Sequence, residues 1–148
     1  MNNQTYRNLS EKNILIAEDN ETDRLLLKCY FGGTGANLYF ASDGEEAVNI
    51  FKNNSIDLVL MDIRMPIKDG KAARKEIADI TRANIDKYVP IIAHTAIDPN
   101  QENLEGFDYC LRKPCTMDKV LGIVDASLSN IFQTVKKYIE IAKQAELN

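Results

Sequence analysis

Reactive polar side chains follow several of the apolar segments in this sequence. Glu18 and Asp19 come directly after one such segment, and Asp62 ends another. Thr95 and Lys113 follow two more. If these segments are parallel strands, their carboxyl ends meet at one edge of a sheet, where ligands bind in doubly wound folds. We therefore expect three carboxylates, a hydroxyl and an ammonium to converge at that edge.

This combination of groups suits phosphoryl transfer. Clustered carboxylates resist ionisation unless a cation compensates their charge. Mg²⁺ prefers oxygen ligands and joins one or two carboxylates to a phosphate. A carboxylate beside Mg²⁺ can act as a nucleophile and form an aspartyl-phosphate, while a lysine neutralises the charge of the phosphoryl group. A threonine hydroxyl can then bond a phosphoryl oxygen, so the sequence predicts a phosphoacceptor site.

The elements that must position these groups alternate between strands and helices. Nearly continuous apolar runs predict buried strands at residues 13–17, 37–41, 56–61, 89–94 and 108–112. The spacing of apolar residues predicts helices at residues 23–33, 44–54, 70–86 and 98–107, and one long helix from Thr116 onward. Five β/α units of this kind predict an α/β fold with a doubly wound parallel sheet.

Composition argues against several other classes of protein. A chain of 148 residues fits one domain, and its net charge of −4 argues against nonspecific nucleic-acid binding. No apolar stretch approaches the roughly 20 residues of a membrane span. With three cysteines and a single histidine, His94, the chain offers no Cys/His metal set and no Ser–His–Asp device. We expect free thiols in a reducing cytosol, and His94 to be structural or exposed rather than a ligand.

Four segments resemble the hallmark segments of response-regulator receiver domains: ILIAEDN, DLVLMDIRMPIKDG, PIIAHTA and LRKP. More narrowly, they are similar to receivers attached to hybrid sensor histidine kinases. The resemblance implies a flavodoxin-like (βα)5 fold, with a five-stranded parallel sheet of order 2-1-3-4-5 and here an extended C-terminal helix. We expect a polar leader over residues 1–12, a receiver domain over 13–130 and a helical extension over 131–148.

The resemblance also implies a phosphoacceptor and a metal site. Asp62 matches the phosphoacceptor of the family. Asp19 and Asp62 would bind Mg²⁺ directly, with the backbone carbonyl of Arg64 as a third ligand. Glu18 would act through a bound water.

Other matching positions would respond to the phosphoryl group or hold the loop beside it. Thr95 matches the hydroxyl that moves onto the phosphoryl group, and Lys113 matches the lysine that pairs with it. Pro66 and Gly70 match the fixed loop next to the acceptor. Pro114 matches a proline that family members usually carry in the cis form.

Two departures from the family pattern concern the transmission of the signal. Cys110 stands where the family usually carries an aromatic side chain, and strand alternation would point Tyr109 to the opposite face. The chain from Thr95 to Lys113 is also shorter than usual by about four residues, roughly one helical turn. We expect the helix at 98–107 to be short or partly unwound, and the output to be transmitted atypically.

The last predicted helix carries apolar residues at alternating spacings of three and four. This stripe consists of Leu121, Val124, Leu128, Ile131, Val135, Tyr138, Ala142 and Ala145. Such spacing is typical of coiled coils. The second half of the helix could form a homodimer with another copy of the chain, pack on a partner or fold back on its own domain.

The leading functional hypothesis is a phosphorylation-dependent signalling switch rather than an enzyme with an external substrate. Asp62 would take a phosphoryl group from a sensor histidine kinase or a histidine phosphotransfer protein in the cytoplasm. Met1 and the polar leader favour a stand-alone regulator over a fragment of a hybrid kinase.

Three alternatives are weaker. A Mg²⁺-dependent aspartyl phosphohydrolase would need a second carboxylate two residues after the nucleophile, where this chain has Arg64. A flavodoxin-like cofactor binder would need a loop rich in Ser, Thr and Gly after the first strand, whereas the acidic segment AEDNETD would repel phosphate. A pseudo-receiver that docks without phosphorylation would not need the complete acidic site.

Overall fold

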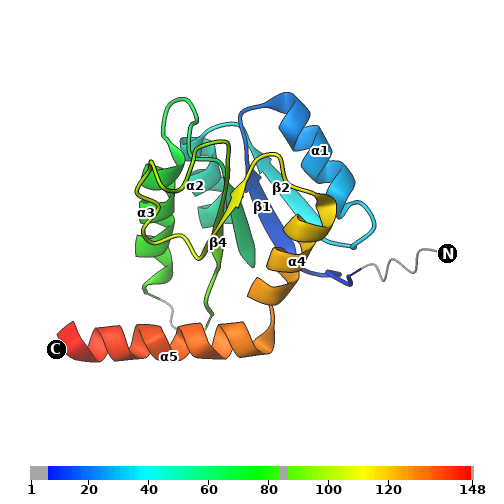
Figure 1. The fold of residues 1–148 in the computed structure, drawn as a ribbon. Helices are drawn as coiled ribbons and strands as arrows, with labels where there is room; N and C mark the ends of the chain where they lie inside the picture. The colour runs from blue at the N-terminus through cyan, green and yellow to red at the C-terminus, as the bar shows by residue number, and fades with distance from the viewer. Residues whose placement is uncertain (1–6, 84–86, 148) are drawn as a thin grey trace.

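A single five-stranded parallel sheet forms the centre of the protein in the computed structural model, which describes residues 7–83 and 87–147 (Figure 1). The strand order is β2-β1-β3-β4-β5, as the resemblance implies. The strands are β1 Asn13–Ala17, β2 Asn37–Ala41, β3 Leu58–Met61, β4 Ile91–Thr95 and β5 Tyr109–Arg112. All four neighbouring pairs are parallel, so the carboxyl ends of the strands lie at one edge.

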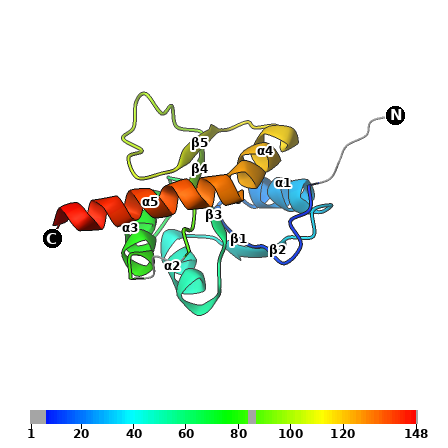
Figure 2. The same cartoon turned by 90° about the horizontal axis from the view of Figure 1, so that it is seen from below.

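Helices cover both faces of this sheet and also one of its ends. Helices α2 (Gly44–Asn53) and α3 (Gly70–Thr81) lie on one face, and α1 (Glu21–Phe31) and α4 (Met117–Ser127) lie on the other. Helix α5 (Asn130–Leu147) runs beneath the sheet, and the view from below shows it crossing from α4 toward α3 (Figure 2). The edge that carries the carboxyl ends of the strands is at the opposite end of the sheet from α5 (Figure 1).

The apolar strands divide the core into two layers. Leu15, Val59 and Met61 pack toward α2 and α3, whereas Ile14 and Leu60 pack toward α1 and α4. Successive side chains of a strand point to opposite faces, so a strand that is covered on both faces must be apolar throughout. This explains why β1, β3 and β4 read as continuous apolar runs.

Side-chain caps fix the start of four helices. The oxygens of the capping residues accept a hydrogen bond from the backbone N–H three residues later, for Asn20, Asp43, Asp69 and Thr116. Such a cap satisfies one of the unpaired N–H groups at a helix start. Two of these helices, α1 and α3, begin shortly after Asp19 and Asp62, so their caps also fix the loops that carry these acids.

Residues 98–107, expected to form a short or partly unwound helix, form turns instead, so the segment is unwound throughout and the helix itself was wrongly predicted. The Asp98 side chain accepts a hydrogen bond from Asn100 N at 2.9 Å, and Asn103 accepts one from Glu105 N at 3.0 Å. These local bonds compete with helical bonds. Gly106 has a φ of 92°, which a continuing helix does not allow.

The prediction of one long C-terminal helix is also wrong. The chain leaves α4 at Leu128, and Ser129 Oγ accepts a hydrogen bond from Phe132 N at 3.2 Å, which starts α5 in a new direction. The apolar stripe is therefore broken: Val124 is buried in the core, whereas Ile131 is 80% exposed. The helix folds back along its own domain (Figure 2), and its outward side chains Ile131, Val135 and Tyr138 remain exposed.

The predicted helix at residues 70–86 is shorter than expected. It ends at Thr81, where the N–H of Arg82 bonds the carbonyl of Ala78. Residues 84–86 lie outside the described residues. The predicted strands agree with the observed ones to within two residues at each end.

We predict opposite effects on stability for two glycine-to-alanine substitutions. A Cβ at Gly70 would overlap the carbonyl oxygen of Asp62 and lie 2.9 Å from the Cα of Ile63, so Gly70→Ala is expected to lower the free energy of unfolding by roughly 1–3 kcal/mol. A Cβ at Gly122, inside α4, has 3.6 Å to its nearest neighbour, and Gly122→Ala is expected to raise that free energy by about 1 kcal/mol. Urea unfolding measures both, and equal shifts would contradict the close approach at Gly70.

Candidate functional site

Three carboxylates meet at the carboxyl ends of β1 and β3. Oxygens of Glu18, Asp19 and Asp62 all lie within 4.8 Å of one another. Glu18 is 1% exposed and Asp62 is 7% exposed, whereas Asp19 faces solvent. Oxygen donors of this kind suit a hard divalent cation such as Mg²⁺, which keeps several waters and takes one or two carboxylates. The residues present therefore fit the predicted metal.

Lys113, which directly follows the outermost strand β5, binds the carboxylates next to β1 and β3. Its Nζ lies 2.5 Å from Glu18 Oε2, 3.0 Å from Asp23 Oδ2 and 3.1 Å from Asp62 Oδ2. Burial alone would lower the pKa of the Lys113 ammonium, but the hydrogen bonds to Glu18 and Asp23 and the charge of Asp62 raise it above its ordinary value. The lysine therefore stays charged and joins three acids.

Asp23 was not predicted from the sequence as a site residue. It lies in the first turn of α1, where Asn20 caps its N–H. The signal that could have identified it is its position one helical turn after Asp19. The prediction began this helix at residue 23, but it begins at Glu21, and this start turns Asp23 toward Lys113.

The Glu18 side chain is the most deeply buried of the acids. Burial raises its pKa to about 7; the hydrogen bond from Lys113 opposes this shift, and the charge of Asp62 adds to it. Its second oxygen accepts a hydrogen bond from Asn20 N at 3.1 Å. A buried carboxylate beside other acids resists ionisation, and a bound cation would favour its charged form.

The loop after β3 holds the Asp62 side chain in one orientation. Its Oδ1 accepts a hydrogen bond from Ile63 N at 2.7 Å, and its own N–H donates to Ala17 O. Gly70 N bonds Ile63 O at 2.7 Å, so the start of α3 closes the loop. Ile67 has a φ of 69°, an unusual value for a β-branched residue, and marks the tight turn between them.

A cleft of about 390 Å³ opens beside Asp62. Its walls are formed by Asp62, Arg64, Thr95, Ala96, Ile97, Asp98, Gln101 and Arg112. Thr95 is 1% exposed, and its Oγ1 accepts a hydrogen bond from Ile97 N at 3.3 Å. The structure thus brings Glu18, Asp19, Asp62 and Lys113 into direct proximity, while Thr95 and Arg64 share the cleft with Asp62.

Four further residues lie in or next to the strands that end at the site. His94 is buried, and burial together with the charge of Lys113 lowers its pKa to about 4, so it is neutral near pH 7. The peptide bond before Pro114 is cis, as the resemblance implies. Cys110 is half-buried, whereas Tyr109 is 45% exposed, which agrees with the prediction that they point to opposite faces.

Comparison with known sequences identifies the same segments. A family model described as the response regulator receiver domain matches residues 14–125. The chain is 38% identical over 115 residues to the autoinducer 1 sensor kinase/phosphatase LuxN of Vibrio campbellii. That alignment covers 75% of this chain and 13% of LuxN, so the chain spans only a small part of this relative's length.

Comparison with solved structures gives the same fold. A chain from the CheX-CheY-BeF3-Mg complex of Borrelia burgdorferi is 30% identical, with a TM-score of 0.71 over 82% of this chain and 92% of that one. A chain from the Saccharomyces cerevisiae complex of the histidine phosphotransfer protein Ypd1 with the receiver domain of Ssk1 is 28% identical. Its TM-score is 0.71, over 78% of this chain and 87% of that one.

We predict that Glu18 makes stability depend on pH in the metal-free protein. Between pH 4.5, its ordinary pKa, and about 7, the folded protein keeps a proton on Glu18 that the unfolded chain releases. The contribution of Glu18 to the free energy of unfolding therefore falls as the pH rises through this window, by at most about 1.4 kcal/mol per pH unit. Glu18→Gln removes this dependence.

Urea unfolding in EDTA at a series of pH values measures the difference between variant and wild type. We expect Glu18→Gln to gain stability relative to wild type as the pH rises from 4.5 to 7. Glu146→Gln makes the same exchange at an exposed position of α5 and serves as the control. If both variants track the wild type in parallel, the burial of Glu18 has no energetic effect.

Proposed function

This chain belongs to the response regulator receiver domain family, and from that premise we propose that Asp62 accepts a phosphoryl group from a phosphohistidine on a sensor histidine kinase or a histidine phosphotransfer protein. The observation that carries this proposal is the position of Asp62, held in a rigid loop with Lys113 Nζ 3.1 Å from one oxygen and an open cleft beside it. Glu18 is an implausible acceptor because it is 1% exposed.

In this step, an oxygen of Asp62 forms a bond to phosphorus as the bond between phosphorus and the histidine nitrogen breaks. The electron pair of the broken bond stays on the imidazole, and the product is an aspartyl-phosphate. The positive charge of Lys113, 3.1 Å from an Asp62 oxygen, would offset the negative charge of the transferred phosphoryl group. This is a switch that takes part in its own phosphorylation, not an enzyme with an external substrate.

We assign the metal ligands as the resemblance implies. Asp19, Asp62 and the backbone carbonyl of Arg64 would hold Mg²⁺, and Glu18 would act through a water. When bound, the ion supplies positive charge that offsets the carboxylates and the phosphoryl oxygens. The clustering of three carboxylates within 4.8 Å supports this assignment.

Thr95 and Lys113 would convert phosphorylation into a change of conformation. Thr95 Oγ1 is held by one long hydrogen bond, 3.3 Å from Ile97 N, so its hydroxyl can turn to donate to a phosphoryl oxygen. Lys113 would exchange part of its contacts with Glu18 and Asp23 for the phosphoryl group. Local changes of charge of this kind bias a two-state domain. With Cys110 at the usual aromatic position, no aromatic ring follows Thr95 inward.

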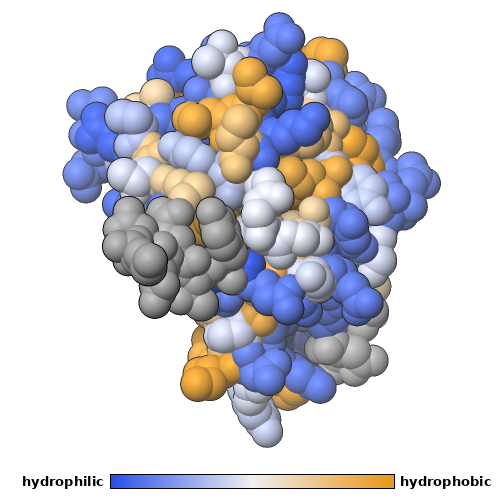
Figure 3. Space-filling view, turned by 90° about the vertical axis from the view of Figure 1, so that its right-hand side faces the viewer, coloured by the Kyte–Doolittle hydropathy of each residue, from blue (hydrophilic) through white to orange (hydrophobic). Residues whose placement is uncertain are grey.

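The partner must reach Asp62 past α1. Leu25 and Leu26 of this helix are 61% and 45% exposed, and Figure 3 shows exposed hydrophobic residues among hydrophilic ones on the face that carries α1 and α4. We propose that these leucines form part of the surface that docks the phosphohistidine protein. Exposed apolar side chains beside a reactive group are typical of interaction sites.

The same proposal covers the organisation and location of the protein. We propose a receiver domain over residues 13–130, with residues 131–148 as an extension, in the cytoplasm, where the phosphodonor would act. Within the described residues, none of the helices is both long and apolar enough to cross a membrane. Docking without phosphorylation is the alternative, and the aspartyl phosphohydrolase is disfavoured because Arg64 replaces the acid that it would need.

We predict that a small phosphodonor such as acetyl phosphate adds one phosphoryl group to the protein, and that the addition requires Mg²⁺. Intact mass spectrometry measures the product with Mg²⁺ and with EDTA. Asp62→Asn is expected to abolish the added mass, because the nucleophilic oxygen is lost. Asp79→Asn, at an exposed position of α3, is the matched control and should be phosphorylated normally. No added mass in the wild type under either condition would favour the docking alternative.

We also propose that the outward face of α5 forms a homodimer with a second copy of the chain. Ile131, Val135 and Tyr138 are 80%, 52% and 69% exposed, although they continue the apolar stripe seen in the sequence. A seam between two such helices would bury these side chains.

Sedimentation velocity over a range of concentrations tests this prediction. We expect a concentration-dependent dimer in the wild type, and a shift to monomer in the double variant Ile131→Gln, Val135→Gln. Leu25→Gln removes a similarly exposed apolar side chain from α1 and should leave the dimer intact. A wild-type protein that stays monomeric at every concentration rules out the dimer.

A further inference from the structure

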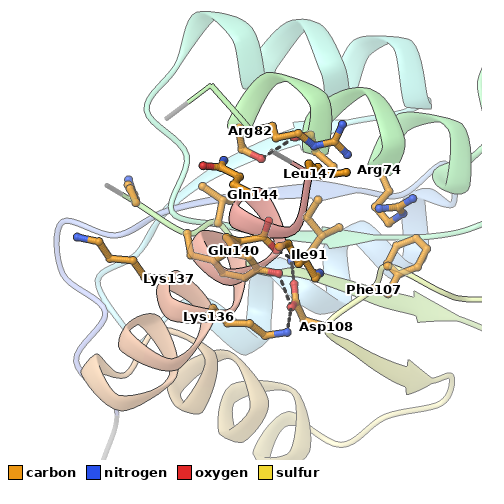
Figure 4. Close-up of a pocket in the computed structure, with 17 residues that line it drawn as sticks. Arg74, Arg82, Ile91, Phe107, Asp108, Lys136, Lys137, Glu140, Gln144 and Leu147 are labelled. Atoms are coloured by element: carbon orange, nitrogen blue, oxygen red, sulfur yellow. Dashed lines mark hydrogen bonds and ion pairs between the residues drawn. The ribbon is translucent and has the colours of Figure 1, made fainter. Parts of the chain in front are cut away.

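A second cavity lies at the end of the sheet opposite Asp62. It has a volume of about 560 Å³ and lies between α3, α5 and the segments that enter β4 and β5 (Figure 4). Each crossover helix of a doubly wound sheet covers part of one face. The β4–β5 connection carries turns instead of a helix, so no helix from it packs beside α3. Helix α2 packs on one side of α3, and the cavity lies on its other side.

One buried carboxylate fixes the lower wall of this cavity. Asp108 accepts hydrogen bonds from Tyr88 Oη at 2.6 Å and from Ile91 N at 2.8 Å, and it pairs with Lys136 Nζ of α5 at 3.0 Å. Lys136 Nζ also lies 5.5 Å from the ring of Tyr88 and 5.6 Å from that of Phe132. The charge of Asp108 is therefore compensated, and Lys136 ties α5 to the segments that enter β4 and β5.

The cavity is positively charged, although the chain carries a net charge of −4. Two acidic side chains, Asp108 and Glu140, line it together with six basic ones: Arg74, Arg82, Lys87, Lys136, Lys137 and Lys143. Figure 4 shows Arg74 of α3 and Arg82, which follows this helix, on one side and Lys136 and Lys137 of α5 on another. Four of the six pair with acids: Arg82 with Asp79, Lys87 with Asp57, Lys136 with Asp108 and Lys143 with Glu140. Among the residues that the structure describes, Arg74 and Lys137 form no ion pair, so their charge is available to a ligand.

Arg74 is positioned to present its guanidinium to an anion. Its Cζ lies 5.7 Å from the centre of the Phe107 ring, and its side chain packs against Gly106, where a Cβ would lie within 3.0 Å of the guanidinium. A guanidinium that is stacked on a ring keeps its N–H fork available for phosphate oxygens. Phe107, Val89 and Ile91 add an apolar surface to the cavity. Ligand cavities usually combine such a surface with a few polar anchors.

We propose that this cavity binds a nucleotide, that is, an organic phosphate that carries a flat ring. The phosphate contacts Arg74, and the ring packs on the apolar wall. The volume lies within the range of about 300–1,000 Å³ that is typical of small-molecule sites. The ligand would bridge α3 and α5, so binding should hold α5 more firmly on the domain. The site uses none of the residues that we assign to phosphoryl transfer.

Calorimetric titration tests the proposal with the full chain in EDTA, so that phosphates do not bind through metal at the acidic edge. The probes are ADP, adenosine, which has the ring without phosphate, and pyrophosphate, which has the phosphates without a ring. We expect one saturable site for ADP, with weaker binding of both fragments. Pyrophosphate that binds as tightly as ADP would overturn the assignment of a nucleotide.

Two variants of α3 separate the site from general electrostatics. Arg74→Gln and Lys75→Gln remove the same charge from adjacent positions, but only Arg74 lines the cavity. We expect Arg74→Gln to weaken ADP binding about tenfold, the equivalent of one charged hydrogen bond, and Lys75→Gln to leave it almost unchanged. Equal losses in both variants, or no binding of ADP to the wild type, would overturn the proposal.

Hydrogen exchange gives an independent measurement that does not depend on a variant. Saturating ADP should slow amide exchange in α5 and α3, since the ligand contacts both. If ADP binds but exchange slows only near Asp62 and Lys113, the nucleotide lies at the acidic edge instead and the proposed cavity is wrong. The phosphorylation assay on Asp62 is unaffected by either outcome, so the two proposals can fail separately.

Discussion

The acidic site at the carboxyl ends of the strands depends on the contacts of the Lys113 ammonium with three carboxylates. The ammonium lies within 3.1 Å of oxygens from three acids: Glu18 directly after β1, Asp23 in α1 and Asp62 directly after β3. Removing a charged partner from a buried cluster costs several kcal/mol, because the remaining charges are left unpaired. The lysine thus connects β5 to the other side of the sheet. The same contact places one positive group next to the carboxylate that we propose as the phosphoryl acceptor.

The sequence allowed the strands and their end residues to be predicted because both follow from short-range patterns. A strand covered on both faces must be apolar throughout, and the first polar residue marks its end, as at Glu18 and Asp62. Asp23 could not be found in this way, because its contact with Lys113 depends on where α1 begins and how that helix is turned. Nor do short-range patterns reveal the burial of Glu18, since it arises from packing around it.

The two wrong helix predictions have local physical causes that periodicity does not detect. Residues 98–107 contain Asp98 and Asn103, whose side chains bond nearby backbone N–H groups and stabilise turns. At Ser129 a side-chain cap starts a new helix inside a continuous apolar stripe, so the stripe does not predict the break. In both places one or two polar side chains outweigh the pattern of the surrounding residues.

The connection between β4 and β5, which forms turns, contributes residues to both the cleft beside Asp62 and the cavity beside α5. At the acidic edge, Gln101 and Asp98 of this connection line the cleft next to Asp62. At the other end the same connection leads to Asp108, which anchors α5 through Lys136. If Thr95 moves toward a phosphoryl group, as we propose, the first backbone to be displaced would be this connection, which has turns in place of a helix. The connection ends at Asp108, which pairs with Lys136 of α5 at 3.0 Å, so it joins the cleft beside Asp62 to the helix at the other end of the sheet.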